Sequence, residues 1–283
     1  MSETDFETRD SADMTPPPAG ADSNIKPLLQ LKELGKRSRA RGLRLKNEDI
    51  LVAIDGEMFF GNADELHTRL TLTPPANAIG EGDEGEDDDY YDEDEEEEEE
   101  KRAIVTLYRD GELFDLLVPG PLGGTWAFAS PDMTDICKSE LNGHLVEAAD
   151  KYANYEILRD IKDLCVIYST QPEVLPRIVP FIWLVQNRLW EPLLATIVIY
   201  TMGLGVHWVV FALVYILTCV YFGRGQISIL RSYAMFQDRQ MWMVVAARSI
   251  KEAQETARRL KPKCKFKFSY IPPPKRRALQ PAE

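Results

Sequence analysis

The chain has 283 residues and a formal net charge of −13, which is enough for one soluble domain of ordinary size beside a membrane segment. The acidity is concentrated in one block, because removal of residues 81–100 changes the net charge from −13 to +3. Four cysteines stand far apart without Cys-x-x-Cys spacing. This pattern argues against a zinc site or a disulfide framework, and we interpret the cysteines as structural.

Residues 1–24 are polar and rich in proline, and we predict a disordered tail there because they bury too little apolar surface to offset chain entropy. The N-terminus has neither a basic n-region nor an apolar h-region, so we expect no cleavable signal and soluble parts in the cytoplasm. Residues 26–46 follow with eight basic side chains beside several leucines. A basic arm facing lipid and an ordinary solvated helix both remain open for this segment.

A compact β-rich unit is predicted next. Residues 49–56 form a short apolar run that ends in a turn signal, and residues 62–70 predict a short helix with Asn62 as its N-cap. Residues 103–109 and 113–118 predict paired strands, because the Asp110-Gly111 step between them is a strong hairpin signal. The expected order is strand, helix, strand, strand.

These residues resemble the latter half of a PDZ domain. Gly42-Leu43 and the run 48–56 are similar to the PDZ pattern G-L-x-x-G-D-x-I-L-x-I-N-G, although Glu48 stands where the family has glycine. The resemblance implies a PDZ-like fold over residues 25–120. No glycine-rich loop of the kind that grips a C-terminal carboxylate precedes Gly42, so we expect the fold without binding of C-terminal tails. The candidate partner-binding residues are Gly42, Leu43, Ile50, Leu51 and Ile54.

An acidic insertion over residues 75–101 interrupts this unit. Sixteen acidic residues and no basic ones lie between Glu81 and Glu100, and such a density of like charge predicts an open, solvated and disordered loop. A second interpretation is an electrostatic gate that competes with anionic lipid for the basic segments of the chain. No calcium site is expected, because the block lacks the glycine and terminal glutamate of a dedicated calcium loop.

Residues 121–175 are interpreted as a linker and a long amphipathic helix. From residue 135 to residue 169 the apolar side chains recur at intervals that include three and four residues. The following stretch, 176–190, is apolar nearly all round and is bounded by Pro176 and Pro192. We predict an interfacial helix there that leads the chain to a bilayer.

A membrane hairpin of two helices is predicted over residues 191–223. Residues 192–222 contain no charged side chain, and Met202-Gly203-Leu204-Gly205 interrupts them, so Gly203 and Gly205 are the expected turn. Basic residues flank the run at both outer ends, which favours cytoplasmic N- and C-termini. This topology without a targeting signal suits a bacterial plasma (inner) membrane, and an organellar membrane also remains open. Each arm has about fifteen to seventeen residues, so full crossing and entry into one leaflet both remain open. A buried hairpin in a soluble helical core is the other alternative.

Residues 224–272 predict a small basic α+β unit. Residues 241–246 suit a strand, Ser249 to Glu252 form a capping box that opens a helix, and residues 263–268 alternate as a strand does. An earlier strand is predicted near residues 232–236. Residues 273–283 are expected to be a tail.

The fold class expected is therefore α+β: a PDZ-like domain, a long helix, a membrane hairpin and a strand-helix-strand tail. Common phosphate, acyl-transfer and zinc motifs are absent from the sequence, so we expect no catalytic, cofactor or metal residues and no enzyme. The expected function is a non-catalytic scaffold, adaptor or assembly factor, whose partners are membrane lipids and a membrane-associated protein but not nucleic acid. A homo-oligomeric transport or stress-response component and an electrostatic lipid sensor are the alternatives, and the oligomeric state is left open.

Overall fold

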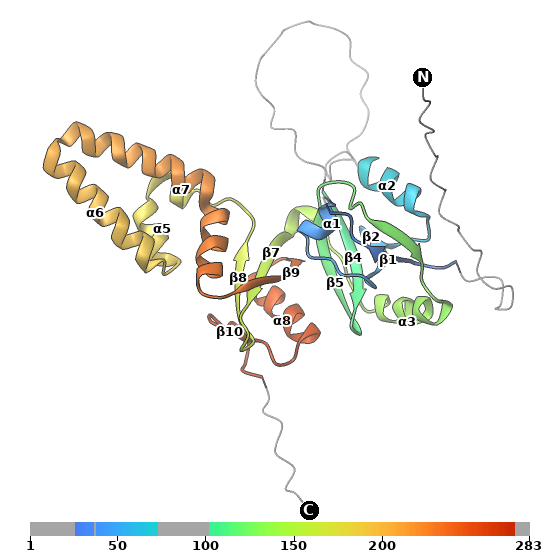
Figure 1. Ribbon diagram of the computed structural model, residues 1–283. Helices are drawn as coiled ribbons and strands as arrows, with labels where there is room; N and C mark the ends of the chain where they lie inside the picture. The colour runs from blue at the N-terminus through green and yellow to red at the C-terminus, as the bar shows by residue number, and fades with distance from the viewer. Residues whose placement is uncertain (1–25, 37, 73–101, 275–283) are drawn as a thin grey trace, which may run out of the picture.

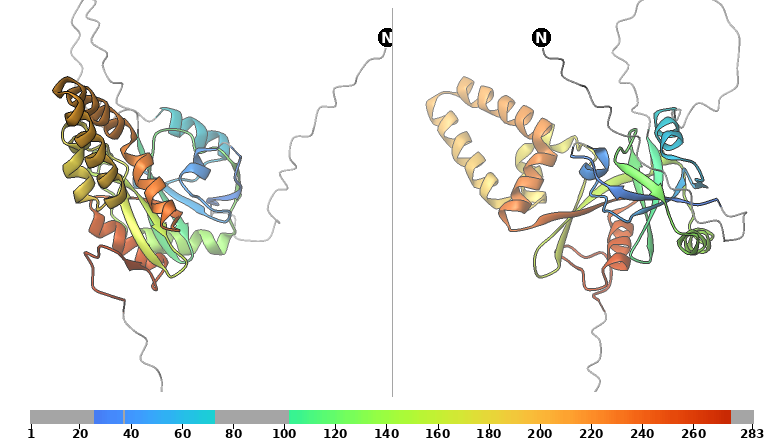
Figure 2. Two further views of the ribbon diagram at one scale, coloured as in Figure 1. Left: turned by 60° about the vertical axis from the view of Figure 1, so that its left-hand side comes forward. Right: turned by 45° about the vertical axis from the view of Figure 1, so that its right-hand side comes forward.

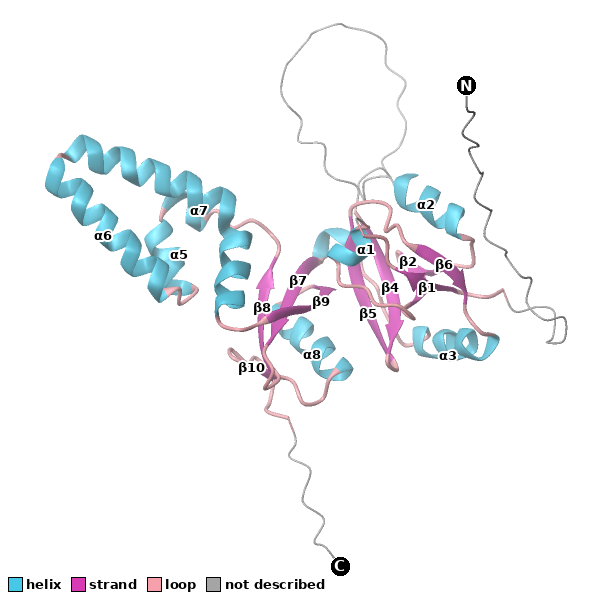
Figure 3. Cartoon of the chain, viewed as in Figure 1, coloured by secondary structure: helices cyan, strands magenta, loops and turns pink. Residues whose placement is uncertain are grey.

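The computed structural model describes residues 26–36, 38–72 and 102–274, so the predictions for the 1–24 tail, the 75–101 insertion and residues 275–283 lie outside the described residues. The described chain is a mixed α+β structure with two β-sheets and a group of helices to one side of them (Figures 1 and 3). Its elements are β1 (Leu29–Glu33), α1 (Arg39–Gly42), β2 (Ile50–Ile54), β3 (Glu57–Met58), α2 (Ala63–Leu72), β4 (Ala103–Arg109), β5 (Glu112–Val118), β6 (Thr125–Phe128), α3 (Pro131–Leu141), the 3-10 turn η1 (Ala149–Lys151), β7 (Ala153–Arg159), β8 (Leu164–Ser169), α4 (Leu175–Ile178), α5 (Pro180–Gln186), α6 (Trp190–Val206), α7 (Trp208–Phe236), β9 (Gln240–Ala247), α8 (Ile250–Leu260) and β10 (Lys265–Phe266).

The first sheet has the strand order β5-β4-β2-β1-β6, with β3 also paired to β2, and every pair in it is antiparallel. The predicted strand around residues 49–56 is confirmed as β2, and the predicted hairpin is confirmed as β4 and β5. Asp110 and Gly111 have φ angles of 52° and 93°, as a two-residue type I′ turn requires. The predicted helix is confirmed as α2, where Asn62 Oδ1 accepts a hydrogen bond from the Glu65 amide at 2.8 Å.

The basic segment 26–46 is neither an exposed arm nor a solvated helix, so both interpretations of it are wrong. It contains the strand β1 and the four-residue helix α1. Leu28, Leu29 and Leu31 are almost fully buried, whereas Lys32 and Glu33 are exposed. Apolar and polar residues alternate from Leu29 to Lys32, which is the pattern of a strand with one buried face.

The second sheet has the order β10-β8-β7-β9, in which β10 runs parallel to β8 and the other pairs are antiparallel. The predicted long helix over residues 135–169 is therefore wrong, because that stretch holds most of α3, a loop and the strands β7 and β8. The prediction failed because a spacing of four residues, which suits a helix, is also an even number, and residues an even number apart lie on the same face of a strand. Ala153 and Ile157 consequently lie on one face of β7 as readily as they would lie on one face of a helix.

Residues 224–272 do not form a separate unit. The strands β9 and β10 pair with β7 and β8, which precede the long helices in the chain. The predicted strand near residues 232–236 is wrong, since α7 continues to Phe236. The predicted strand and capped helix are confirmed as β9 and α8, and the Ser249 side chain accepts a hydrogen bond from the Glu252 amide. Only Lys265 and Phe266 of the last predicted strand pair with a neighbour.

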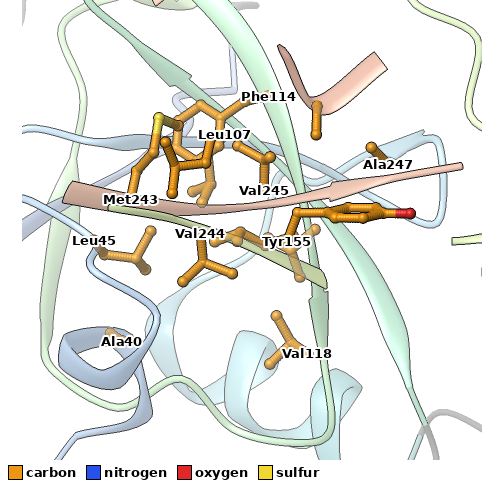
Figure 4. Packing of buried hydrophobic residues seen from close by; sticks show 14 of the residues in the cluster. Ala40, Leu45, Leu107, Phe114, Val118, Tyr155, Met243, Val244, Val245 and Ala247 are labelled. Atoms are coloured by element: carbon orange, nitrogen blue, oxygen red, sulfur yellow. The ribbon is translucent and has the colours of Figure 1, made fainter. Parts of the chain in front are cut away.

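The two sheets share one hydrophobic core. Leu107 and Phe114 of the first sheet belong to the same buried cluster as Met243 and Val245 of the second (Figure 4). The Asn154 side chain adds a polar link, because it accepts a hydrogen bond from the Leu117 amide at 3.0 Å and donates one to the Leu117 carbonyl at 2.7 Å. The sheets therefore form one body rather than two domains joined by a linker.

The helices α4 to α7 are inserted between β8 and β9 and project away from the sheets (Figure 2). The predicted interfacial helix over 176–190 is two short helices, α4 and α5, separated at Val179, where the backbone departs from helical geometry directly before Pro180. The helices α6 and α7 then pack against each other as an antiparallel pair. We call this pair, Trp190–Phe236, the helical hairpin.

Candidate functional site at the base of an apolar helical hairpin

The outer part of the helical hairpin exposes apolar side chains on all sides. Met202 is 68% exposed and Trp208 is 69% exposed, and no Asp, Glu, Lys or Arg occurs between residues 192 and 222. Contiguous apolar surface on this scale marks a membrane or protein interaction site rather than a water-facing helix pair. The large exposed apolar residues of this region are Leu194, Ile197, Val198, Ile199, Met202, Leu204, Val206, Trp208, Val209, Val210, Leu213, Ile216, Leu217, Val220 and Tyr221.

The turn of the hairpin falls at His207 rather than at the predicted Gly203 and Gly205. Helix α6 continues to Val206, and His207 is extended, with its Nδ1 accepting a hydrogen bond from the Val209 amide at 3.2 Å. His207 thus caps the start of α7. Gly203 has a different role, because a Cβ there would lie 3.3 Å from the Phe211 Cα, whereas a Cβ at Gly205 would meet nothing within 4 Å. Gly203 permits close helix packing.

The dimensions of the hairpin compare closely with those of a bilayer. Helix α7, with 29 residues, is the one helix in the described ranges that is long and apolar enough to cross a membrane, and α6 is a shorter apolar helix of 17 residues. At ~1.5 Å per residue α6 is about 25 Å long, against a hydrocarbon core of ~30 Å. Both flanking strands, β8 and β9, pair antiparallel with β7, so the chain leaves β8 opposite Tyr155 and re-enters β9 opposite Arg159, near the two ends of β7.

Polar contacts fix the base of the hairpin to the second sheet. Arg231 of α7 forms a two-pronged ion pair with Glu156 of β7, which is buried, and its Nε to Glu156 Oε2 distance is 2.6 Å. Trp183 of α5 is also buried and donates from Nε1 to Glu173 Oε2 at 2.9 Å. A Cβ at Gly223 would lie 2.6 Å from Arg177 Cγ, so α4 crosses α7 in close contact. Arg231 therefore joins the hairpin to the second sheet, while the other two contacts join α5 to the segment after β8 and α4 to α7.

A cleft of about 370 Å³ lies at this base. It is bounded by β8, the turn between α5 and α6, the last turns of α7, and the segment that follows β10. Arg188 and Lys267 are the cationic side chains that line it, and Glu173 is its carboxylate. Partial burial, together with the nearby Arg239 and Arg188 guanidinium groups, lowers the pKa of Lys267. A cleft of this size can hold a small molecule or a lipid headgroup.

Three of the five residues that the sequence suggested for partner binding belong to the interior, whereas Gly42 is exposed. Ile50, Leu51 and Ile54 are buried in β2, which has strands on both sides, so their side chains are core rather than contact surface. Gly42 ends α1, and Leu43, which follows it, packs partly buried against the core. The sequence pattern identified them because an apolar strand followed by a turn signal is primarily a packing signature.

The strand β6 lies on the edge of β1 that β2 leaves free. It pairs antiparallel with β1, with Leu31 opposite Trp126 and Leu29 opposite Phe128, and it contacts α2. PDZ domains bind peptides by strand addition to a sheet edge. Because β6 of the same chain covers this edge of β1, the outer edge of β6 ends the first sheet within the described residues, and Phe128 there is 47% exposed.

The cysteine prediction requires a correction. Cys165 on β8 and Cys264 just before β10 form a disulfide, with their Cα atoms 6.5 Å apart and a separation of 99 positions in sequence. No spacing rule could find a pair so distant, since only the parallel pairing of β8 with β10 brings them together. Cys137 and Cys219 are free, and burial raises the pKa of the Cys137 thiol to about 11.

Within the described residues no group of three or more His, Cys, Asp or Glu side chains is placed to hold a metal ion. His144 contacts Asp115 at 2.9 Å, and Asp115 in turn accepts a hydrogen bond from the Thr106 hydroxyl at 2.7 Å. These contacts connect the loop after α3 to β4 and β5.

No family model, curated protein or solved structure matches this chain.

Proposed function

We propose that this protein is a non-catalytic scaffold, adaptor or assembly factor that is anchored in a membrane by the helical hairpin and holds a protein partner beside that membrane. The observation that supports this most is the exposure of apolar side chains along a hairpin inserted between β8 and β9. Such a surface is unfavourable in water but favourable in hydrocarbon. The sheets would then stand on one side of the bilayer.

Charge at the base supports a cytoplasmic orientation for the sheets and both termini. Arg177, Arg188 and Arg224 are all exposed where the apolar part of the hairpin begins and ends. An excess of Arg and Lys beside membrane segments favours the cytoplasmic side. We therefore propose a bacterial plasma membrane location, with membrane lipids as the first partner.

The outer edge of β6 is the surface we propose for the protein partner. It ends the first sheet within the described residues and presents Phe128, and an edge strand offers backbone groups to an added strand. The resemblance to PDZ domains supports strand addition as the mode of binding. It differs from that family in that β1 is already covered by β6.

Exchange of the hairpin tests the anchoring role. Residues 191–223 are replaced in the full-length protein by an unrelated two-helix membrane hairpin of similar length. A scaffold should stay in the membrane fraction and retain its crosslinked partner, because the hairpin serves only as an anchor. Loss of function with retained membrane location would instead indicate that the hairpin itself acts, as in a homo-oligomeric transport component.

A photo-crosslinking amino acid at Phe128 tests the partner surface. Leu145 is the matched control, since it is also an exposed apolar residue but lies in the loop after α3. We expect a reproducible crosslinked protein from position 128 in native cells and none from position 145. Equal products from both positions would show that the edge of β6 is no specific docking surface.

A further inference from the structure

We propose that the cleft at the base of the helical hairpin binds a phosphate group, and that a phospholipid headgroup supplies it. Three cations gather here: Arg188 and Lys267 line the cleft, and Arg239 lies close enough to Lys267 to act on its charge. Phosphate oxygens are strong acceptors for guanidinium and ammonium groups. The lipid source rests on the proposed membrane anchoring, whereas the phosphate chemistry does not.

The three cations have no direct ion-pair partner among the described residues, although the Glu191 carboxylate lies close enough to Lys267 to act on its charge. In the described part of the chain, none of Arg188, Lys267 and Arg239 makes an ion pair with a carboxylate. Arg239 is only 7% exposed, and its buried Nε has no hydrogen-bond partner, while its Nη1 donates to Gln237 at 2.5 Å. A buried charge of this kind is unfavourable unless an anion balances it.

The carboxylates near the cleft are engaged by neutral donors. Glu173 accepts from Trp183 Nε1, and Glu191 accepts from the Tyr233 hydroxyl at 2.7 Å. Neither forms an ion pair with the three cations. The positive charge therefore remains available to a ligand that brings its own negative charge.

Arg188 is held over the cleft by its backbone and by an aromatic ring. Its φ angle is 55°, a left-handed conformation that is uncommon for a residue other than glycine. Its Cζ lies 4.6 Å from the centroid of the Phe268 ring. The guanidinium is thus positioned by stacking before any ligand arrives, which reduces the entropy that binding would cost.

The cleft begins at the depth of a headgroup. Its lining residues on α7 run from Gln226 to Tyr233, which are three and ten residues beyond Gly223, the residue just before Arg224. These steps correspond to about 5 Å and about 15 Å along the helix. Each headgroup layer of a bilayer is about 5–7 Å thick. If residues up to Gly223 lie in hydrocarbon, the cleft opens at the level of lipid phosphates, and acyl chains can lie along the exposed apolar residues of the hairpin.

Native mass spectrometry of the full-length protein, titrated in detergent with phosphatidylglycerol, tests the proposal. The variant R188Q/K267Q removes the two lining charges, and K263Q/K265Q is a matched control because both lysines are exposed, close in the chain and outside the cleft lining. We expect the first variant to weaken lipid binding about tenfold or more and the control to change it less than about twofold. Equal losses would overturn the proposal in favour of a general basic surface.

Two further probes separate phosphate from lipid recognition. Diacylglycerol, which has the acyl chains without the phosphate, should not bind, and its equal retention would overturn phosphate recognition. Glycerol 3-phosphate, which has the phosphate without the chains, should bind more weakly than the lipid and lose binding in R188Q/K267Q. Equally tight binding of this soluble ester would overturn the lipid source. Failure of the proposed anchoring is recognised separately, because the wild-type protein would then be absent from the membrane fraction.

Discussion

The two sheets and the helical hairpin are built from similar apolar side chains that meet opposite surroundings. In the sheets these side chains are buried in a core shared by both sheets, as for Phe114 and Val245. In the outer hairpin they are exposed, as for Leu217 and Met202. The apolar side chains of the sheets therefore shield one another from water, whereas those of the outer hairpin need apolar surroundings from outside the chain. The hydrophobicity of the sequence alone does not distinguish the two regions.

The largest expected effect is a loss of stability on truncation in the shared core. Phe114→Ala should cost about 3–5 kcal/mol in the free energy of unfolding, since the side chain is 2% exposed and its removal leaves a cavity. Leu217→Ala, in the exposed part of the hairpin, should change stability in detergent by no more than about 0.5 kcal/mol. Chemical unfolding of both variants in the same detergent measures the difference. Equal losses of unfolding free energy in the two variants would contradict this contrast and indicate that the hairpin is packed as tightly as the core.

This contrast also explains which elements the sequence predicts well. Local signals were sufficient for the Asp110-Gly111 hairpin, the Ser249 cap of α8 and the helical pair around Gly203, because each depends on neighbouring residues. Pairing between distant strands was not visible. The strand β7 was predicted as helix, since residues four apart share a face in both structures.

The candidate site was less accessible to sequence reasoning for the same reason. The cleft joins Arg188, Gln226 and Lys267, which come from three separated segments that meet only when β9 and β10 return to β7 and β8. The Lys-rich segment around Lys267 was recognisable from the sequence as part of a basic unit. Its position beside Arg188 depended on the topology.

The second effect concerns the disulfide, which closes a loop that contains the entire hairpin. Reduction of oxidised protein, or Cys264→Ser, should lower stability by about 2–4 kcal/mol, because the bond ties β10 to β8 across 99 residues of sequence. Unfolding with and without reductant measures this. Cys219→Ser is the control, since that cysteine is free and should leave the stability of the sheets unchanged. A loss confined to the hairpin would contradict the role of the bond in the second sheet.

The same cysteines report on which side of the membrane the sheets stand. Disulfides are rare in the cytoplasm and common outside it. The Cys165–Cys264 bond therefore favours the face opposite to the one that the flanking arginines favour. The cytoplasmic orientation predicts instead that both cysteines are thiols in freshly quenched cells, alkylated after unfolding and read by mass spectrometry. An oxidised pair would place the sheets on the opposite face and reverse the proposed orientation. Unfolding before alkylation is needed because Cys165 and Cys264 are both fully buried.

A smaller effect is expected where the two regions meet. Glu156→Gln should lower stability by about 1–3 kcal/mol, because it removes a charge-assisted pair with Arg231 from a buried position. Hydrogen exchange should rise at the last turns of α7 more than in the shared core. Lys151→Gln, which breaks an exposed pair with Glu147, is the control and should change stability by less than about 1 kcal/mol. Uniform exchange increases would mean that hairpin and sheet open together.

The smallest expected effect lies near the tip of the hairpin, where two neighbouring glycines should respond in opposite ways. Gly203→Ala should push the helices apart and destabilise their packing by about 1 kcal/mol or more, because its Cβ would lie 3.3 Å from the Phe211 backbone. Gly205→Ala meets nothing within 4 Å and should stabilise α6 by about 0.5–1 kcal/mol through its helix propensity. Spin labels at Leu204 and Val210 should report a wider separation only in the first variant. If both substitutions are neutral, the close approach of α6 and α7 is not maintained in the bilayer, and the hairpin acts as two independent apolar helices instead of one packed anchor.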